Sequence, residues 1–392
     1  MDFKISRIVK TNIANIRSSY AALTCRLYYR VVIIGLAVIL LLAGQNRAST
    51  LDQDSTQNNE IKNKSHSVLP IVMYDSDIGL GTGIKCVFKN YRGHKESFDL
   101  LLFGSTRGEQ NYAAGLSIPD FECRQGGIYK IAFDFKLEYD KLLKSNYFGI
   151  GNDTKNNDRQ FPSELFKASM AISHAINSHL IIGAGAKFHH SSVYDYNLAW
   201  QTISAATPGA GQNDWTTISL FGRYDTRNSY INPDRGFKAE GTVEQAVKLI
   251  NRYWDFAKVR FEFSHYHKVL WPKHTLAYRL WLQQIIGDAP YQELSKIGDG
   301  WTARGYKAGR FLDKSMVLVS AEYRFPIYKN LGGVTFFDNG RVWPELTGFN
   351  LKNWHFNWGI GLRLYLENFV ARIDIGHSVE GTRIFFNFSH VF

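Results

Sequence analysis

The histidines come closest to catalytic chemistry in this chain of 392 residues. His265 and His267 share one face of a strand, because side chains two residues apart point the same way, and His189-His190 ends another strand. Such pairs can bind metals or transfer protons, but without nearby carboxylate partners they are more often wall or rim residues. The sequence has no G-x-S-x-G, H-E-x-x-H or phosphate-loop motif, and no serine that can be assigned as the nucleophile of a Ser-His lipase. We therefore expect no enzyme, no cofactor and no metal site.

The elements that carry these side chains follow the two-residue period of β-strands from Val68 to the end of the chain. In residues 129–139 every second side chain is apolar and those between are mostly charged, and residues 354–367 alternate in the same way with His355, Asn357, Arg363, Tyr365 and Glu367 on the face opposite the apolar side chains. The alternation predicts 16 strands, near residues 68–75, 79–90, 95–107, 109–121, 126–140, 162–176, 178–190, 213–226, 236–249, 252–267, 273–287, 314–327, 331–343, 354–367, 369–378 and 381–392. Short turns such as 230–236 alternate with long loops at 141–161, 191–212 and 288–313, which is typical of an antiparallel membrane barrel.

The polar face of these strands carries many ionisable side chains, which suits a wet lumen better than the core of a soluble barrel or sandwich. They are Lys258, Arg260, Glu262, Arg279, Glu322, Arg324, Asp338, Arg363, Arg372, Asp374 and Arg383. No propeller repeat is visible, and a sandwich seldom has so many long strands. The composition, with 15% aromatic residues, 33 glycines and 9 prolines, agrees with the aromatic girdles of membrane barrels. The predicted fold class is all-β, a 16-stranded antiparallel transmembrane β-barrel.

An apolar run of 12 residues, 31–42, follows Arg26 and Arg30 and precedes the small residues Ala48 and Ser49. This is typical of a secretory signal peptide, and the run is shorter than the roughly 20 residues of a membrane-spanning helix, although an uncleaved signal is an alternative. An upstream start codon would explain the 30 residues before the run. We expect residues 1–48 to be an N-terminal extension and signal peptide, 49–67 a disordered periplasmic linker and 68–392 the barrel.

The net charge of +11 does not indicate nucleic acid as a partner, because +6 of it lies in residues 1–48. In the rest of the chain basic residues alternate with apolar ones and face nearby acids, which is poor geometry for a phosphate-binding surface. The three cysteines, Cys25, Cys86 and Cys123, fit neither a disulfide framework nor a zinc site. Cys86 and Cys123 are expected to be free, although an oxidising compartment would permit a bridge.

The long loop at 288–313 contains Arg304-Gly305-Tyr306 within GDGWTARGYKAGRF (298–311). This stretch resembles the sixth-loop motif of the BamA/TamA superfamily, the bacterial surface antigen family. SAEYRFPI (320–327) and GVTFFDNGRVW (333–343) resemble the two strands that follow in that family, NYFGIGNDT (146–154) resembles its third loop, and INPDRGF (231–237) matches one of its turns. The resemblance covers about residues 68–392, and the order and spacing of the motifs make it specific.

The resemblance implies that the sixth loop folds back into the lumen and that Arg304 contacts acidic side chains there. Alternation turns Glu322 and Asp338 toward the lumen, where both can accept hydrogen bonds from a guanidinium that has lost water. Gly305 and Gly340 would leave room for close approach of the backbone. An ordinary polar turn at 304–306 is the alternative for the three-residue motif alone. A pair of Arg304 and Asp338 that stabilises the barrel without gating it is a second alternative.

The predicted last strand places Ile384, Phe386, Phe388 and Phe392 on one face, and Phe392 is the final residue. This arrangement resembles the C-terminal signal that the outer-membrane barrel assembly machinery reads. We therefore expect that machinery to be a partner for the insertion of this chain.

The resemblance implies insertion or translocation of proteins, or of lipids, through a lateral opening between the first and last strands, where an unpaired strand edge can accept an incoming strand. Pro70 removes one hydrogen-bond donor near that opening. The linker of about 19 residues is too short for a periplasmic POTRA repeat, so we expect a separate POTRA-type or chaperone partner, or a stand-alone barrel. Outer-membrane lipids and lipopolysaccharide are the other expected partners, in the outer membrane of a bacterium. A passive solute channel is the alternative function.

Overall fold

The computed structural model describes residues 64–156, 160–194, 203, 207–249, 253–269, 271–366 and 370–392. The predicted N-terminal extension, the predicted signal peptide and most of the predicted linker lie outside these residues. Within the described ranges, no helix has both the length and the apolar character needed to cross a membrane.

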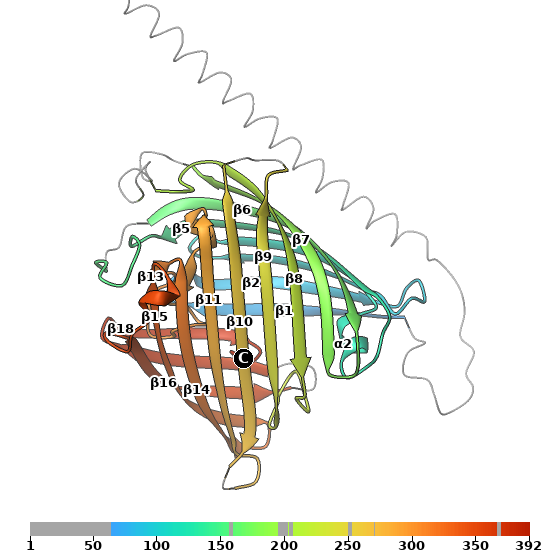
Figure 1. Cartoon of the computed structure of the whole chain (residues 1–392). Coiled ribbons are helices and arrows are strands. Elements are labelled where there is room, and N and C mark those ends of the chain that lie inside the picture. The colour runs from blue at the N-terminus through green and yellow to red at the C-terminus, as the bar shows by residue number, and fades with distance from the viewer. Residues whose placement is uncertain are drawn as a thin grey trace, which may run out of the picture. The chain divides into compact units, whose positions relative to one another are not determined.

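Sixteen strands in the described part of the chain form a closed antiparallel barrel, which confirms the predicted fold class (Figure 1). Around the barrel, strands β1 to β11 follow one another, β14 to β18 come next, and β18 lies beside β1. In Figure 1, β8 to β11 are on the near side and β1 and β2 are on the far side. The strands are β1 (Ser65–Asp75), β2 (Gly79–Lys89), β3 (Ser97–Ser105), β4 (Gln110–Ile118), β5 (Ala132–Asn146), β6 (Gln160–Ala175), β7 (Leu180–Val193), β8 (Asn213–Asp225), β9 (Gly236–Val247), β10 (Asp255–Lys268), β11 (Thr275–Asp288), β14 (Ser315–Tyr328), β15 (Leu331–Trp343), β16 (His355–Tyr365), β17 (Val370–Ser378) and β18 (Gly381–Phe388).

The remaining elements lie in the connections between the strands. The connection from β11 to β14, residues 289–314, is called loop 6 below; it contains the turn η1 (Tyr291–Glu293) and a small hairpin of β12 (Ser295–Ile297) and β13 (Phe311–Asp313). The turn η2 (Leu346–Gly348) lies between β15 and β16, and the helix α2 (Phe121–Arg124) between β4 and β5. Loop 6 belongs to the long-loop end of the barrel, and two-residue turns such as 329–330 belong to the opposite, short-turn end.

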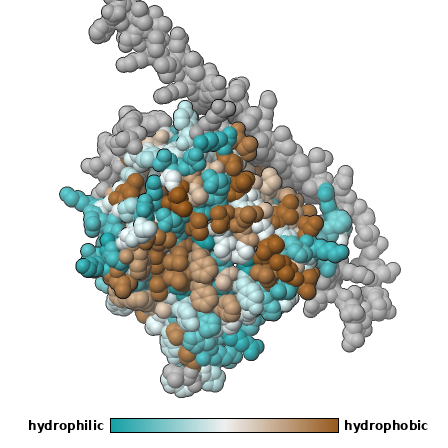
Figure 2. Space-filling model, viewed as in Figure 1, coloured by the Kyte–Doolittle hydropathy of each residue, from teal (hydrophilic) through white to brown (hydrophobic). Residues whose placement is uncertain are grey.

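The apolar side chains of the strands face outward. Along β16, Phe356, Trp358 and Ile360 are 43%, 53% and 55% exposed, while Asn357 and Arg363 on the opposite face are 0% exposed. Figure 2 shows hydrophobic residues in a band across the middle of the visible face, with hydrophilic residues above and below it. A soluble barrel has the reverse arrangement, whereas a bilayer requires this one.

Several predicted boundaries are wrong. The predicted barrel start at residue 68 is too late, because Ser65 to Ser67 already pair with Val87 to Lys89 of β2. The predicted fifth strand, 126–140, is too early, because residues up to Asn146 continue to pair with β6 across an irregularity between Leu142 and Ser145. Helix α2 was not predicted, because four residues are too few to display a helical period. Cys86 and Cys123 are both free.

The seam between β1 and β18 has far fewer paired residues than any other strand pair of the barrel. Only Tyr74 with Phe386 and Asp75 with Phe385 are partners across it, whereas β1 pairs with β2 along all of Ser65–Asp75. Within the described residues, the β18-facing edge of β1 from residue 65 to residue 73 therefore has no strand partner. This unpaired edge lies toward the short-turn end of the barrel.

Candidate functional site

Loop 6 brings the fully buried Arg304 side chain against β14 and β15 on the inner face of the barrel. Its Nε and Nη2 donate to the two carboxylate oxygens of Asp338, each at 2.9 Å, and its Nη1 donates to Glu322 Oε1 at 2.7 Å. The Phe336 ring centre lies 3.5 Å from the guanidinium carbon. Burial by itself lowers the pKa of Arg304, but the carboxylates of Asp338 and Glu322 raise it above its usual range. The guanidinium is thus held charged and in one orientation.

Further buried arginines extend this cluster to β16 and β17. Arg363 donates to Asp374 Oδ1 at 2.6 Å and lies 3.4 Å from Glu322 Oε1. Arg372 pairs with Asp374 and also donates to the Gly300 carbonyl of loop 6 at 2.8 Å. Because buried arginines need more acceptors than the carboxylates alone provide, loop 6 contributes backbone carbonyls to the same cluster. The cluster therefore attaches loop 6 to four barrel strands.

Two glycines allow the close approach of loop 6 to the wall. A Cβ on Gly305 would lie 2.8 Å from the Cβ atoms of both Asn357 and Ser378. A Cβ on Gly340 would lie 2.9 Å from Ile297 Cδ1. Both distances are shorter than real Cβ contacts. A side chain at Gly305 would force two Cβ atoms of the wall or the loop itself to move, whereas one at Gly340 would displace only the end of the Ile297 side chain.

Tyr306, the third residue of the loop motif, fixes the loop through its hydroxyl and its ring. The hydroxyl donates to the Phe356 carbonyl of β16 at 3.1 Å. The ring packs edge-on against Phe311 with 5.1 Å between centroids, and Phe311 is stacked on His355 at 3.5 Å. The residues singled out by the sequence, 304–306 with Glu322, Asp338 and Gly340, are thus gathered in one place.

The third loop, between β5 and β6, packs on loop 6. The Gly151 amide donates to the Leu312 carbonyl at 2.7 Å. Arg310 of loop 6 donates to Thr154 Oγ1 at 2.7 Å and to Glu380, in the β17–β18 loop, at 2.7 Å. Loop 6 therefore connects elements on both sides of the long-loop end.

A second anchor holds the beginning of loop 6 on the opposite side of the lumen. Glu293 of η1 accepts a hydrogen bond of 2.9 Å from Trp215 Nε1 of β8 and is paired with Lys258 of β10. Lys258 also lies 3.7 Å from Glu244, which accepts a hydrogen bond of 2.6 Å from Lys187. Loop 6 is thus attached to both halves of the wall by separate ionic groups.

Asp77, in the connection from β1 to β2, joins the two sides of the seam at its long-loop end. Its Oδ1 accepts from Arg383 Nη1 of β18 at 2.6 Å, and its Oδ2 accepts from the Ala308 amide of loop 6 at 2.6 Å. Arg107 donates to the Asp77 carbonyl at 3.2 Å. We call this group the Asp77 clasp; it closes one end of a seam whose other end is unpaired.

The prediction that Phe392 lies on the same face as Phe386 and Phe388 is wrong. The strand ends at Phe388, and Ser389 with φ of 65° turns the chain inward, which breaks the alternation of faces. Phe392 is buried in a cluster with Tyr266 of β10. The last residues therefore cross to the opposite wall instead of continuing along β1.

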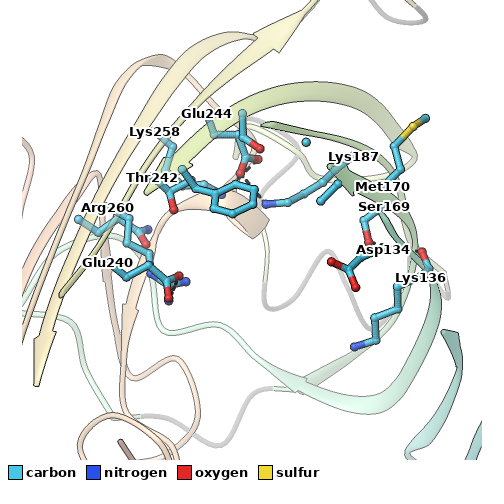
Figure 3. A pocket seen from close by; sticks show the side chains of 15 residues that line it. Asp134, Lys136, Ser169, Met170, Lys187, Glu240, Thr242, Glu244, Lys258 and Arg260 are labelled. Carbon is cyan, nitrogen blue, oxygen red and sulfur yellow. Dashed lines mark hydrogen bonds and ion pairs between the residues drawn. The ribbon is translucent and has the colours of Figure 1, made fainter. Parts of the chain in front are cut away.

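The lumen also contains an open cavity of about 390 Å³ on the side from β5 to β11. Figure 3 shows charged side chains around it, with Asp134 and Lys136 on one side and Glu240 and Arg260 on the other. The open, polar lumen that the sequence predicted lies on this side of the barrel, whereas loop 6 and the arginine cluster fill the side from β14 to β17.

The expected lack of carboxylate partners is wrong for two of the histidines: His190 Nδ1 lies 2.6 Å from Asp214 Oδ1, and His189 Nε2 lies 3.7 Å from Glu293 Oε1. His265 Nδ1 lies 2.6 Å from the Tyr278 hydroxyl, and His189 is stacked on Trp215 at 4.8 Å. In the part of the chain that the structure describes, no three His, Cys, Asp or Glu side chains are grouped as they would be around a metal ion. Sequence reasoning missed Asp77 and Glu293, because each is a single acid in a connection and no local pattern distinguishes it from a solvated residue.

Solved structures with the same fold include two kinds of barrel protein. BamA from Haemophilus ducreyi lacking POTRA domains 1-3 matches with a TM-score of 0.60 and 14% identity, over 83% of this chain and 70% of that chain. CdiB from Acinetobacter baumannii matches with a TM-score of 0.52 and 13% identity, over 82% of this chain and 59% of that one. CdiB from Escherichia coli matches with a TM-score of 0.57 and 11% identity, over 82% and 62%. This chain thus spans less than two thirds of either CdiB.

No curated protein matches the sequence significantly. The Omp85 superfamily domain matches residues 90–389, which include β3 to β18 and all of loop 6. A 16-stranded barrel of this family is typical of bacterial outer-membrane proteins. The chain belongs to the Omp85 superfamily.

Proposed function

We propose that this barrel inserts proteins into, or translocates them across, a bacterial outer membrane, by accepting an incoming strand on the free edge of β1. The observation that carries the proposal is the seam, where β1 and β18 share two residue pairs and residues 65–73 of β1 keep an unpaired edge. Unpaired N–H and C=O groups on a strand edge pair readily with another extended chain. Membership of the superfamily agrees with the insertion or translocation of proteins that the resemblance of the loop motif implies.

The path of the last residues supports this proposal. If β18 continued straight beyond Phe388, it would cover the edge of β1 at Ile71 and Pro70, as the register of Tyr74 with Phe386 requires. Instead the Ser389 amide donates to the Val370 carbonyl of β17 at 2.7 Å and the chain turns into the lumen. The edge of β1 is therefore accessible from the short-turn end, which we assign to the periplasm.

The Arg304 cluster and the Asp77 clasp would keep the rest of the barrel rigid while the seam accepts a strand. In this proposal Arg304 positions loop 6 and does not act on the substrate. The expected environment is the outer membrane, with its lipids and lipopolysaccharide, and the barrel assembly machinery and a periplasmic POTRA-type or chaperone protein are the proposed partners.

A seam-locking disulfide tests the proposal. Tyr74→Cys with Phe386→Cys, in a background of Cys86→Ala and Cys123→Ala, places two cysteines at partner positions across the seam. The protein is reconstituted in lipid vesicles, and the folding of a urea-denatured outer-membrane barrel is followed by electrophoretic mobility. We expect the oxidised variant to lose the acceleration of folding and the reductant to restore it.

The matched control is Ile84→Cys with Leu102→Cys, which locks β2 to β3 at partner positions away from the seam. We expect this disulfide to have no effect on client folding. Equal activity of the oxidised and reduced seam variants would contradict the proposal.

A further inference from the structure

We propose that this barrel also binds a phosphate-bearing ligand, in a second cavity of about 390 Å³ at the short-turn end of its lumen. This cavity lies among α2, the turn from β6 to β7 and the turn from β8 to β9. Its described lining residues all lie between Arg124 and Tyr230 in the sequence, so neither β1 nor β18 contributes to it. The site is therefore separate from the seam, and it does not depend on the insertion of proteins.

The charged side chains of the cavity are mainly basic. Arg124, Arg223 and Arg227 line it, and Asp225 is the one acid among its described lining residues. Both oxygens of Asp225 are used by Arg227, whose Nε and Nη2 donate to them at 2.9 and 2.8 Å. Because this carboxylate is committed to Arg227, the charges of Arg124 and Arg223 need other partners.

Arg124 has an acidic partner on only one edge of its guanidinium. Its Nη1 and Nη2 donate to the two carboxylate oxygens of Asp134 at 2.9 and 2.7 Å. The Arg124 side chain is 6% exposed, and its buried Nε has no hydrogen-bond partner within the residues that the structure describes. A buried N–H of a charged group without an acceptor costs free energy, so this edge favours a ligand that brings one.

Arg223, on the inner face of β8, carries a second charge without a direct partner. It forms no ion pair with the described residues, and its buried Nε lacks a hydrogen-bond acceptor among them. The guanidinium carbons of Arg223 and Arg124 lie 5.6 and 5.8 Å from the centre of the same Phe121 ring. Since the ring keeps two like charges near each other, an anion between them would replace their repulsion by attraction.

Neutral side chains of the lining also offer hydrogens to a ligand. Asn228 Oδ1 accepts two backbone amides of the β8–β9 turn at 3.2 Å each, and Ser229 Oγ accepts two more at 3.2 and 3.1 Å. Because backbone amides occupy these oxygens, the NH2 group of Asn228 and the hydroxyl hydrogen of Ser229 remain to donate. The cavity therefore presents donors to a ligand that is rich in acceptors.

A phosphate group fits this lining better than a carboxylate or a halide ion. Its several oxygens can accept from two guanidinium groups and from neutral donors at once, whereas a carboxylate has only two oxygens. The cavity has room for more than the phosphate itself, since cavities of roughly 300–1,000 Å³ hold whole small molecules. The ligand is therefore a phosphate ester, supplied either as a free small molecule or as the headgroup of a phospholipid.

Calorimetric titration of the folded barrel in a phosphate-free maltoside detergent tests the site. The probes are glycerol 3-phosphate for the free ester and dihexanoylphosphatidylglycerol for the headgroup. We expect saturable binding, and we expect Arg223→Gln to weaken it at least about tenfold, because a hydrogen bond from a charged donor is lost. Tighter binding of glycerol 3-phosphate assigns the site to free esters, and tighter binding of the lipid assigns it to headgroups.

Arg235→Gln is the matched control, because it removes the same charge from an exposed residue of the β8–β9 turn that does not line the cavity. We expect this variant to bind both probes as the wild type does. If neither probe binds the wild type saturably, or if the two variants weaken binding equally, the proposal is overturned. The proposed insertion of proteins is unaffected by either result, because the seam contains no residue of the cavity.

A second variant keeps the test decisive if Arg223→Gln does not fold. Asn228→Asp keeps the Oδ1 acceptor of the turn and places a negative charge in the lining. Asn177→Asp makes the same change at an asparagine of the β6–β7 turn, which also accepts two backbone amides but does not line the cavity. We expect Asn228→Asp to bind at least about fivefold more weakly than Asn177→Asp, and equal affinities would contradict the site.

Discussion

Arg304 of loop 6 and Asp338 of β15 are joined by two hydrogen bonds of 2.9 Å, from Nε and Nη2 along one edge of the guanidinium, with both side chains 0% exposed. A bidentate pair fixes orientation as well as distance, so loop 6 has one position relative to β15. Loss of either partner leaves an uncompensated charge in a dry environment.

Asp338→Asn is expected to destabilise the barrel by about 3–5 kcal/mol, because it leaves the Arg304 charge without its main partner. The temperature at which the folded band disappears in semi-native electrophoresis measures the loss. Glu345→Gln, at an acid outside this cluster, is the control. An unchanged transition temperature for Asp338→Asn would show that the pair contributes little to the stability of the folded barrel.

Gly305→Ala is expected to cost about 1–3 kcal/mol, because the new methyl group would lie 2.8 Å from Asn357 Cβ and Ser378 Cβ and would force loop 6 away from the wall. Gly241→Ala is the matched control in β9, where a Cβ would meet nothing within 4 Å. Protease sensitivity of loop 6, compared between the two variants, reports the displacement. Equal sensitivity would contradict the close packing at Gly305.

Asp77→Asn is expected to weaken the long-loop end of the seam by about 2 kcal/mol, because it removes the charge that holds Arg383 of β18. The rate of hydrogen exchange at the Asp75 and Phe385 amides should rise, while exchange in the β9–β10 ladder should not. Arg383→Gln should have the same effect on the same amides. If neither variant changes exchange there, the clasp does not hold the seam.

The anchor at Glu293 is expected to weaken in acid. Burial opposes ionisation of this carboxyl group, but Lys258 and His189 outweigh it and lower its pKa from 4.5 to about 2. A carboxyl group with a lowered pKa in the folded state stabilises it above the unfolded pKa, and this stabilisation is lost as the pH falls from about 4.5 toward 2. The melting temperature should therefore fall more steeply over this range for the wild type than for Glu293→Gln. If the melting temperatures of the wild type and of Glu293→Gln fell equally with pH, the stabilisation could not be assigned to the Glu293 carboxylate.

The barrel and the Arg304 contacts could be predicted from the sequence because each depends on regular spacing. Alternation fixes the face of every strand residue, so Glu322 and Asp338 had to face inward once the strands were placed. The loop motif then supplied the arginine by family resemblance.

The turn at Ser389 could not be predicted, since its positive φ is a local backbone conformation that the periodicity of apolar side chains does not reveal. The ion pairs of Glu293 and Asp77 could not be predicted for another reason. Their partners are distant in the sequence, with Lys258 35 residues and Arg383 306 residues away, and pairing over such distances depends on the closed barrel. The sequence alone therefore predicts the strands of the barrel better than the contacts made by the loops that connect them.

The most direct measurement of the central claim is disulfide capture of a client strand at the edge of β1. Val72→Cys in β1 and Thr82→Cys in β2 are partners on adjacent strands, so they differ by one strand spacing, about 4.8 Å, in distance from the seam. Each is made in the Cys86→Ala and Cys123→Ala background and mixed with an unfolded barrel that carries one cysteine in its last strand. The account predicts a disulfide with Val72→Cys and none with Thr82→Cys, because only a strand directly beside β1 is close enough. Equal capture at both positions, or at neither, would contradict it.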